Sequence, residues 1–462
     1  MNKYNKNGLS DKEVIKSKEK YGTNEIKKSK TNSFLSLLIE SLGDPIIKIL
    51  LIALAIKVVF LFRDFDWFET LGILIAIFLA SFISSISEYG SEKAFDEYIQ
   101  KAEEATGLEI ETIACPTNTD DRQAKITTIL SSGDDSIDVI TINDEMMSAF
   151  KNTGYLEPLQ DTVMTPEVMK NFPEKYMKEM TMVGDNAYSV PCFMDILAFW
   201  VDEEKMANAG LTEIKTKEDF EKYVEANSAD GKYGYGDAWE KTYVFNSIGT
   251  FVNLFGGDYY DWTNPKTQEA VKFMYDMMKN NETPISQLAD QYDPMMQKFF
   301  DGDYASIFMY VGAIQTFVNS GKYGADKQHI APMPTFENKT AYMSTWGYVL
   351  NSASKNKAAA EKFLKYAASE QGELDYTEMT SRLPARTDVL ESDELAAMDL
   401  PGLDEIREYV ADTELLARPM APQAMEFIIE MGSLFQQYVS DELTLDEFCK
   451  KAQQSVDTYV VK

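Results

Sequence analysis

The chain has 462 residues, and its 75 acidic and 44 basic side chains give a formal net charge of −31 at pH 7. This length accommodates two or three domains, and a strongly acidic surface repels phosphates, so we expect no nucleic-acid partner. Three cysteines lie far apart and His329 is the single histidine, a composition that predicts neither a metal site nor a cofactor.

The charge is unevenly distributed along the chain. Residues 1–92 carry 12 Lys and Arg against 11 Asp and Glu, whereas residues 93–462 carry 32 against 64. A nearly neutral segment followed by a strongly acidic one indicates two parts of different character.

The first part has the pattern of a membrane anchor. Residues 1–43 are Lys-rich and end in an amphipathic stretch, which is compatible with a cytoplasmic segment at a membrane surface. Two apolar runs follow, Pro45–Phe62 and Thr70–Ile86, with a short polar turn between them. Each run is close to the lower length limit for a spanning helix, so we predict a transmembrane helical hairpin over residues 44–92. Two buried helices of a soluble domain are the alternative.

Residues 1–95 also resemble the N-terminus of P-type calcium-transporting ATPases. The resemblance rests on the segment Tyr21–Glu25 (YGTNE), the apolar hairpin, and the segment Ser87–Phe95 (SEYGSEKAF). The family's Thr-Gly-Glu-Ser and Asp-Lys-Thr-Gly-Thr motifs do not occur in the sequence, so the phosphorylated aspartate is missing. We therefore expect no ion pumping.

The second part alternates between helical and strand-like patterns. Asp96–Thr106 predicts a helix, Leu108–Ile113 a strand, and Arg122–Leu130 a helix. Ile137–Ile142 then predicts a strand that ends where Asn143-Asp144 start the next helix. Repeated strand and helix units are typical of an α/β sheet with crossover connections.

Farther along the chain, Gly184–Asp202 contains a continuous apolar run that predicts a strand covered on both faces. Glu218–Asn227 and Asn264–Lys279 predict amphipathic helices. Gln297–Phe308 predicts a helix, a turn and a strand, and Ser354–Ser369 predicts an Ala-rich helix.

Taken in order, these segments resemble the sugar-type extracellular solute-binding proteins of ABC importers. The carrying motifs are the crossover Gly184–Asp202, the spacing Phe299/Gly302/Ala305, the return crossover Trp346–Leu350, the helix Ser354–Ser369 and the turn Ser381–Arg386. The resemblance implies a two-lobed, periplasmic-binding-protein-like (Venus-flytrap) α/β fold for residues 93–462. Lobe 1 would use about residues 95–199 and 339–385, and lobe 2 about 200–338 and 386–462.

That family normally starts with an export signal and a first strand before the helix of Asp96–Thr106. Here the pump-like sequence runs directly into this helix. We therefore predict a chimera, joined near Glu92–Glu97.

The resemblance implies non-covalent capture of a carbohydrate, with an oligosaccharide as the expected ligand, in a cleft between the lobes. The partners would be an ABC permease and the membrane, and no reaction would be catalysed. Two alternatives remain open: a glycan-acting enzyme, which needs two carboxyl groups across the scissile bond, and a non-functional pump fragment fused to a binding domain.

A sugar site needs an aromatic ring for the C–H face of the sugar and carboxylates or amides for its hydroxyls. Such ligands bind beyond the carboxyl ends of strands. By these criteria, and by the places that the resemblance gives Asp195, Trp346 and Arg386 in the family's crossovers and turn, the candidate ligand-binding residues are Trp346, Trp239, Asp195, Tyr310, Asp144 and Arg386. Alternatively, Asp144 caps a helix, Trp239 packs in a loop, and Arg386 pairs with a neighbouring acid.

The charge rule and the solute-binding resemblance conflict on location, and for this chain we follow the charge rule and predict the cytoplasmic side. A Lys-rich N-terminus stays in the cytoplasm, and two spans return residue 93 to that side. The solute-binding resemblance instead implies an extracellular domain.

Overall fold

The computed structural model describes residues 92–116, 119–418 and 423–460. The chain divides into two units, Met1–Lys93 with Glu109–Thr119, and Ala94–Leu108 with Asp120–Lys462. Within the described ranges, no helix combines the length and apolar character that crossing a bilayer requires. The predicted hairpin of residues 44–92 and the segment 1–43 lie outside those ranges, apart from Glu92.

The second unit is organised around a six-stranded sheet with the order β1-β7-β4-β5, in which β6 also pairs with β4 and β8 with β7. Every pairing is antiparallel except that of β8 with β7. The strands are β1 (Val139–Asn143), β4 (Val190–Asp202), β5 (Ser306–Tyr310), β6 (Gln328–Ala331), β7 (Thr340–Leu350) and β8 (Glu414–Ala417). A separate hairpin consists of β2 (Met182–Val183) and β3 (Asn186–Ala187).

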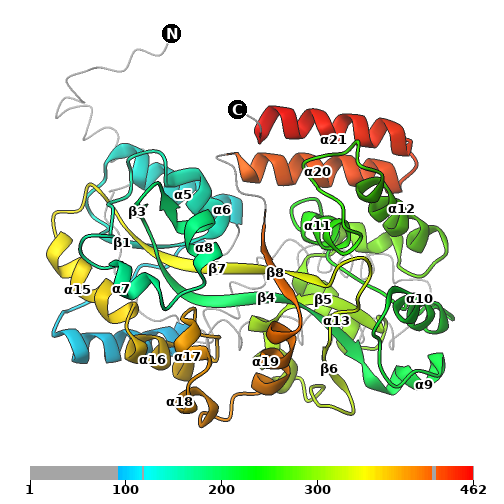
Figure 1. The fold of residues 1–462 in the computed structure, drawn as a ribbon, viewed down its shortest axis with the longest axis horizontal. Coiled ribbons are helices and arrows are strands. Elements are labelled where there is room, and N and C mark those ends of the chain that lie inside the picture. Colours follow the sequence, from blue (N-terminus) through cyan, green and yellow to red (C-terminus); the bar gives the residue numbers. More distant parts are fainter. Residues whose placement is uncertain (1–91, 117–118, 419–422, 461–462) are drawn as a thin grey trace, which may run out of the picture. The chain divides into compact units, whose positions relative to one another are not determined.

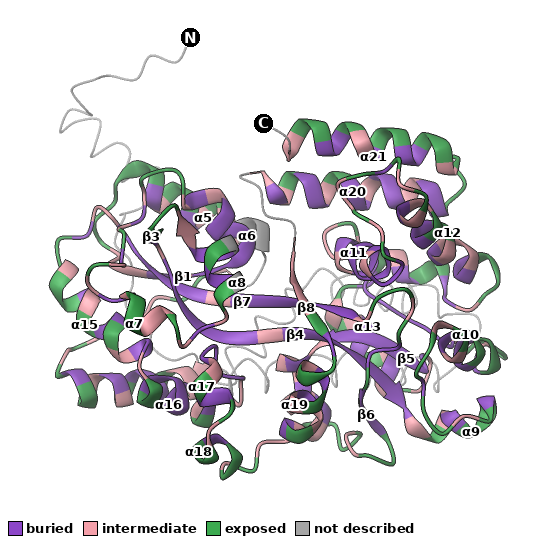
Figure 2. Cartoon of the chain, in the orientation of Figure 1, coloured by how far each residue is buried: buried purple, intermediate pink, exposed green. Residues whose placement is uncertain are grey.

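Strands β4 and β7 form the centre of the sheet and are buried along almost their whole length (Figure 2). This agrees with the continuous apolar run of β4, which predicts cover on both faces. The first part of β4, up to Ile196, pairs with β7, and the part from Leu197 onward pairs with β5 and β6. One strand therefore serves two groups of elements, which flank it on either side in Figure 1.

The first group surrounds β1 and the adjoining ends of β4 and β7. Helices α6, α15 and α16 contact these strands. The group contains a helix over residues 92–106, α5 (Thr119–Ser132), α6 (Asp144–Phe150), α7 (Pro166–Met169), α8 (Glu174–Tyr176), the π-helix η1 (Met177–Thr181), α15 (Lys357–Ala367), α16 (Glu370–Thr380), α17 (Thr387–Leu390) and α18 (Asp393–Ala396). Its core consists of Ile126, Leu130, Ile140, Ile142, Met146, Met147, Phe150, Leu156 and Val349.

The second group surrounds β5, β6 and the far end of β4. Trp200 of β4 is fully buried there, stacks on Phe317 with ring centroids 4.0 Å apart, and donates its indole N–H to the Met309 carbonyl at 2.9 Å. The group contains η2 (Glu203–Lys205), α9 (Met206–Ala209), α10 (Lys217–Ala226), α11 (Val244–Leu254), α12 (Pro265–Lys279), η3 (Ile285–Ala289), α13 (Tyr292–Phe300), η4 (Val311–Ala313), α14 (Ile314–Asn319), α19 (Leu403–Ala411), α20 (Ala424–Val439) and α21 (Leu445–Tyr459).

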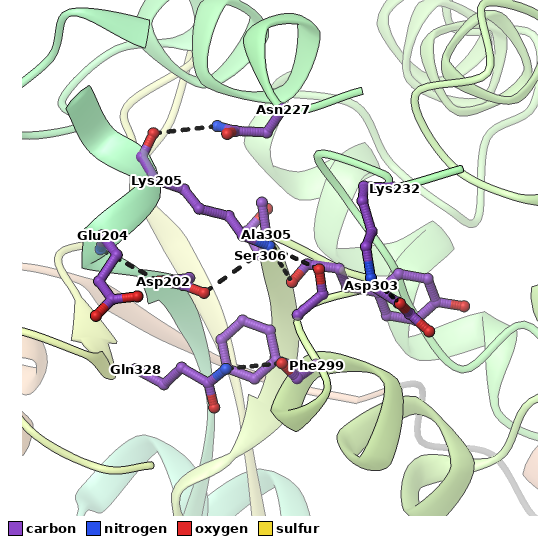
Figure 3. Close-up of polar contacts among 12 residues, drawn as sticks. Asp202, Glu204, Lys205, Asn227, Lys232, Phe299, Asp303, Ala305, Ser306 and Gln328 are labelled. Carbon is purple, nitrogen blue, oxygen red and sulfur yellow. Dashed lines mark hydrogen bonds and ion pairs between the residues drawn. The ribbon is translucent and has the colours of Figure 1, made fainter. Parts of the chain in front are cut away.

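The Phe299–Ala305 motif is a turn tied to the end of β4 (Figure 3). Gly302 has a φ of 72°, in the left-handed region that glycine adopts without a steric cost. Lys205 donates from Nζ to the carbonyls of Gly302, at 2.9 Å, and Tyr304, at 3.4 Å, and lies 3.8 Å from the Asp202 carboxylate. Burial lowers the pKa of Lys205. The motif therefore has a structural role in connecting α13 to β5.

Several predicted elements are confirmed, and one is wrong. The helix of α12 has Asn264 as its cap, which accepts from the Lys266 N–H, with Pro265 at its first position. The predicted strand Leu108–Ile113 is neither helix nor strand. Alternation supplies one apolar face, but it is not sufficient for a strand, because a strand also depends on forming a ladder with a neighbour.

Candidate ligand-binding site

The carboxyl ends of two strands meet at the middle of β7. Strand β1 runs antiparallel to β7 and ends at Asn143, opposite Trp346. Strand β8 runs parallel to β7 and ends at Ala417, opposite Met343. Because β4 occupies the other edge of β7, β1 and β8 approach each other along one edge and leave Ser344 and Thr345 between their ends. The chain departs from the sheet at both ends, a position where open α/β sheets bind ligands.

The strand register places several side chains on one face of the sheet. Phe193 pairs with Trp346, and Asp195 pairs with Ser344. Residues two apart on a strand share a face, so these four side chains lie together. Strand β5 also ends nearby. Its last residue, Tyr310, pairs with Leu197 of β4, which follows Asp195 by two residues.

Arg418 follows β8 and forms ion pairs with two consecutive carboxylates at the start of α6. Its Nη2 donates to Asp144 and, at 3.0 Å, to the Ser344 hydroxyl, and its Nε lies 3.3 Å from Oδ2 of Asp144. Its Nη1 lies 2.5 Å from Oε1 of Glu145. Asp144 and Glu145 are buried, and the Arg418 side chain is 11% exposed. The guanidinium thus binds Asp144 in a bidentate manner, a strong geometry for such a pair.

Burial raises the pKa of Glu145 to about 7, although the charge of Arg418 opposes this rise. Burial by itself would lower the pKa of Arg418, but the charges of Asp144 and Glu145 raise it well above its ordinary value. The guanidinium therefore stays charged, and Glu145 gains a proton near neutral pH.

Tyr310 lies beside this ion-pair group with an unused hydroxyl. Its Oη is buried and has no hydrogen-bond partner among the described residues. Its ring contacts Tyr292 edge-to-face, with centroids 5.9 Å apart. Burial raises the pKa of Tyr310, against the charge of Arg418, so the hydroxyl is neutral and offers both a donor and an acceptor.

Asp195 contacts residues of both groups of elements. Its Oδ1 accepts the backbone N–H of Gly312 at 2.8 Å, and Nη1 of Arg382 lies 3.9 Å from its Oδ2. Burial raises the pKa of Asp195 to about 6, while Arg382 and the Gly312 N–H act in the opposite direction. At neutral pH this side chain is therefore an ionised acceptor with a fixed orientation.

Trp346 is partly buried and lies within an aromatic stack. The Phe193 ring is inclined by 17° to the Trp346 ring at a centroid distance of 6.5 Å. The guanidinium carbon of Arg122 lies 5.0 Å from the Trp346 ring centroid, and that of Arg382 lies 4.5 Å from the Phe193 centroid. Aromatic surface and hydrogen-bonding groups are thus adjacent on the same sheet face.

The other two candidate residues are placed elsewhere. Trp239 is fully buried and packs edge-to-face on Phe435 of α20, with centroids 5.2 Å apart, which matches the alternative of loop packing. Arg386 is buried and donates to Asp388, from Nε at 2.9 Å, and to the Ala368 carbonyl at 2.8 Å. It pairs with a neighbouring acid, as the alternative proposed.

The residue that caps α6 is Asn143 and not Asp144, because the Asn143 side chain accepts a hydrogen bond from the Met146 N–H at 3.0 Å. Three members of the group were not predicted: Glu145, Ser344 and Arg418. Arg418 follows the short segment Glu414–Ala417 (ELLA), of which only the last three residues are apolar. Once β8 is known to be a strand, the strand-end argument that selected Asp144 selects Arg418 as well.

Comparison with known proteins identifies the family. The family model described as "Bacterial extracellular solute-binding protein" matches residues 87–374, which is more than half of the chain. The chain belongs to this family. A second model, "Cation transporter/ATPase, N-terminus", matches residues 1–57. Both predicted resemblances are therefore confirmed, and the two matched segments do not overlap.

Curated relatives of this solute-binding protein cover parts of it. The maltodextrin-binding protein of Bacillus subtilis is 26% identical over 266 residues, which are 53% of this chain and 61% of that protein. A plasma-membrane-type calcium-transporting ATPase of Oryza sativa is 26% identical over 97 residues, 20% of this chain and 9% of the ATPase. The chain thus spans less than two thirds of each of these relatives.

Solved structures share the fold over most of the chain. A T. maritima protein with bound maltose has a TM-score of 0.69 at 18% identity, covering 80% of this chain and 96% of the other. An ABC transporter solute-binding protein from Thermotoga lettingae with bound α-D-tagatose has a TM-score of 0.69 at 21% identity, covering 79% and 95%. The predicted two-lobed α/β fold is confirmed.

Proposed function

We propose that this solute-binding protein captures a carbohydrate, without catalysis, between its two lobes and delivers it to an ABC permease. One observation supports this proposal most directly. Asp195, Tyr310 and the ion-pair group of Arg418, Asp144 and Glu145 lie at the sheet face that also carries Trp346. Carboxylates and hydroxyls that bind sugar hydroxyls thus lie beside aromatic rings that accept the C–H face of a sugar.

We assign different parts of the ligand to different residues. Trp346, extended by Phe193, would stack on a pyranose ring. Asp144 and Asp195 would accept hydrogen bonds from hydroxyls, and Tyr310 would contribute its unused hydroxyl. An oligosaccharide is our preferred ligand, because the Bacillus subtilis relative is named for maltodextrin and two of the similar structures were solved with maltose and maltotriose.

Binding requires the lobes to move apart and close again. Asp144 and Glu145 are buried here, so a ligand reaches them only when the elements around them separate. Strands β4 and β7 connect the two groups of helices, and β8 extends along β7. Rotation about these three segments would open the site, as in other hinge-closing binding proteins.

The permease, the membrane and the side of the membrane are further parts of the proposal. The family description supports an extracellular binding domain. The positive-inside rule, applied to the predicted hairpin, gives a cytoplasmic one. We favour the extracellular placement. Protease added to intact cells should degrade residues 93–462, and protection of these residues until the membrane is permeabilised would contradict this placement.

A glycan panel tests the binding function. Intrinsic tryptophan fluorescence of the full chain is followed while neutral mono- and oligosaccharides are added, with far-UV circular dichroism as the check on folding. We expect a saturable change for at least one malto-oligosaccharide, and no release of nitrophenol from chromogenic glycosides. A folded protein that responds to no glycan would contradict the proposal, and turnover of a glycoside would support the enzyme alternative.

A further inference from the structure

Asp144 and Glu145 form a buried acidic pair. Their carboxylates form hydrogen bonds and ion pairs with nearby groups of the same chain. Glu145 Oε2 accepts from the Asn143 side chain at 2.5 Å, and Asp144 Oδ1 accepts the Glu145 backbone N–H at 3.1 Å. The positive charge comes from Arg418, through the Nε, Nη1 and Nη2 contacts to the two carboxylates. Arg418 in turn contacts Ser344.

A buried carboxylate without a compensating charge is costly. If the site lacked a cation of its own, this pair would favour a ligand that brought one, such as an amine or a guanidinium. The strongly acidic chain would also attract such cations from a distance. Arg418 supplies this positive charge from within the chain.

We infer that Arg418 is a positioning and specificity-determining residue, which supplies the cation for Asp144 and Glu145 so that the site accepts uncharged, hydroxyl-bearing ligands and excludes cationic ones. This inference deepens the proposed function and rests on it. It assigns a ligand class through a residue that contacts the binding groups.

The contact geometry requires a guanidinium rather than any positive charge. Nε and Nη2 face the two oxygens of Asp144, while Nη1 faces Glu145, so one planar group fixes two carboxylates at once. A lysine ammonium is a point charge on a flexible stem and does not reproduce this fork. With both carboxylates held by Arg418, their remaining lone pairs keep fixed directions next to Tyr310, whose hydroxyl has no partner among the described residues.

Chemical rescue tests the inference. In the full-length Arg418→Ala variant, a guanidinium-sized space would remain between Asp144, Glu145 and Ser344. We expect methylguanidinium to raise the melting temperature of this variant saturably, at concentrations that leave the wild type unchanged. The variant should lose at least about tenfold in affinity for maltotriose, because the carboxylates lose their orientation, and methylguanidinium should restore most of that loss.

Two further variants separate positioning from a general structural role. Arg418→Lys keeps the charge and serves if Arg418→Ala does not fold; we expect about tenfold weaker maltotriose binding and no response to methylguanidinium. The double variant Asp144→Asn/Arg418→Ala removes the Asp144 carboxylate as well as the Arg418 guanidinium. It should show little saturable stabilisation by methylguanidinium.

The outcomes distinguish this inference from the proposed function. The thermal-shift arm uses no sugar, so a wild type that binds no maltotriose would contradict the function while methylguanidinium still tests the cation site. Stabilisation by methylguanidinium that is equal in wild type and Arg418→Ala, or absent from the folded variant, would overturn the inference. An unchanged maltotriose affinity in Arg418→Ala or Arg418→Lys would overturn it as well.

Discussion

The Arg418 guanidinium donates two hydrogen bonds to the carboxylate of Asp144, from a position 274 residues farther along the chain. The two residues meet because β1 and β8 end on the same edge of β7, on either side of Ser344. The pair therefore connects the start of α6 to the segment that leads into α20. It links the geometry of the site to the arrangement of the two lobes.

Replacing Asp144 tests the pair directly. Asp144→Asn leaves the Arg418 guanidinium buried with only Glu145 to compensate it, so the free energy of unfolding should fall by roughly 3 kcal/mol. Urea denaturation at neutral pH measures the loss. The control is Asp144→Asn/Arg418→Met, which removes both charges of the pair; Glu145, which then lacks the charge of Arg418, takes up a proton more readily, so most of the stability should be recovered. Equal losses in the single and double variants would show that the pair is not the cause.

The buried Asp237 side chain should make the free energy of unfolding depend on pH. It is buried in the second group, where Ser247 donates to it at 2.7 Å and Tyr235 also donates, with no cation among its contacts. Burial raises its pKa to about 6. Because the folded protein holds this proton more tightly than the unfolded chain, the stabilising effect is greatest below about pH 4 and is lost as the pH rises to about 6.

Asp237→Asn should remove that part of the pH dependence. Relative to wild type, the variant should gain up to about 3 kcal/mol of unfolding free energy between pH 4 and pH 7, because one pKa unit corresponds to about 1.4 kcal/mol. Denaturation series at several pH values measure the difference. The exposed Asp185→Asn makes the same charge change as a control. A wild-type-to-variant difference that is constant with pH would contradict the prediction.

Gly312 is predicted to be essential for the orientation of Asp195. A Cβ at this position would lie 2.9 Å from Oδ2 of Asp195 and 3.1 Å from Nη1 of Arg382. Gly312→Ala should therefore displace both side chains and cost about 1–3 kcal/mol of stability, with weaker sugar binding. Melting curves and calorimetric titrations measure the two effects. Ala313→Gly, which adds no atoms, is the control, and wild-type affinity in Gly312→Ala would argue against a role for Asp195.

The sequence was sufficient to predict those parts of the site that follow from strand ends. Asp144, Asp195 and Tyr310 lie at or near the points where predicted strands end or cross, and the structure brings them to one region. Trp239 was selected on other grounds, as an aromatic residue in a Gly- and Tyr-rich loop, yet it packs against Phe435. That contact joins segments nearly two hundred residues apart, and a single sequence contains no signal for it.

Arg418 and the segment Leu108–Ile113 illustrate two further limits of local patterns. A four-residue strand such as β8 gives too short a pattern to predict with, so the arginine after it was not selected. In Leu108–Ile113 the alternation was clear, but the segment is not a strand, because strand formation depends on a ladder with a neighbour as well as on the local pattern.

The central claim is that the sheet face bearing Trp346 binds a carbohydrate. Its most direct test is calorimetric titration of maltotriose into the full-length wild type, Trp346→Ala and Trp239→Phe, with folding checked by circular dichroism. We predict saturable binding by the wild type and by Trp239→Phe, and a loss of at least about tenfold in Trp346→Ala, where the stacking surface is removed. Absence of binding in the folded wild type, or unchanged affinity in Trp346→Ala, would contradict the account.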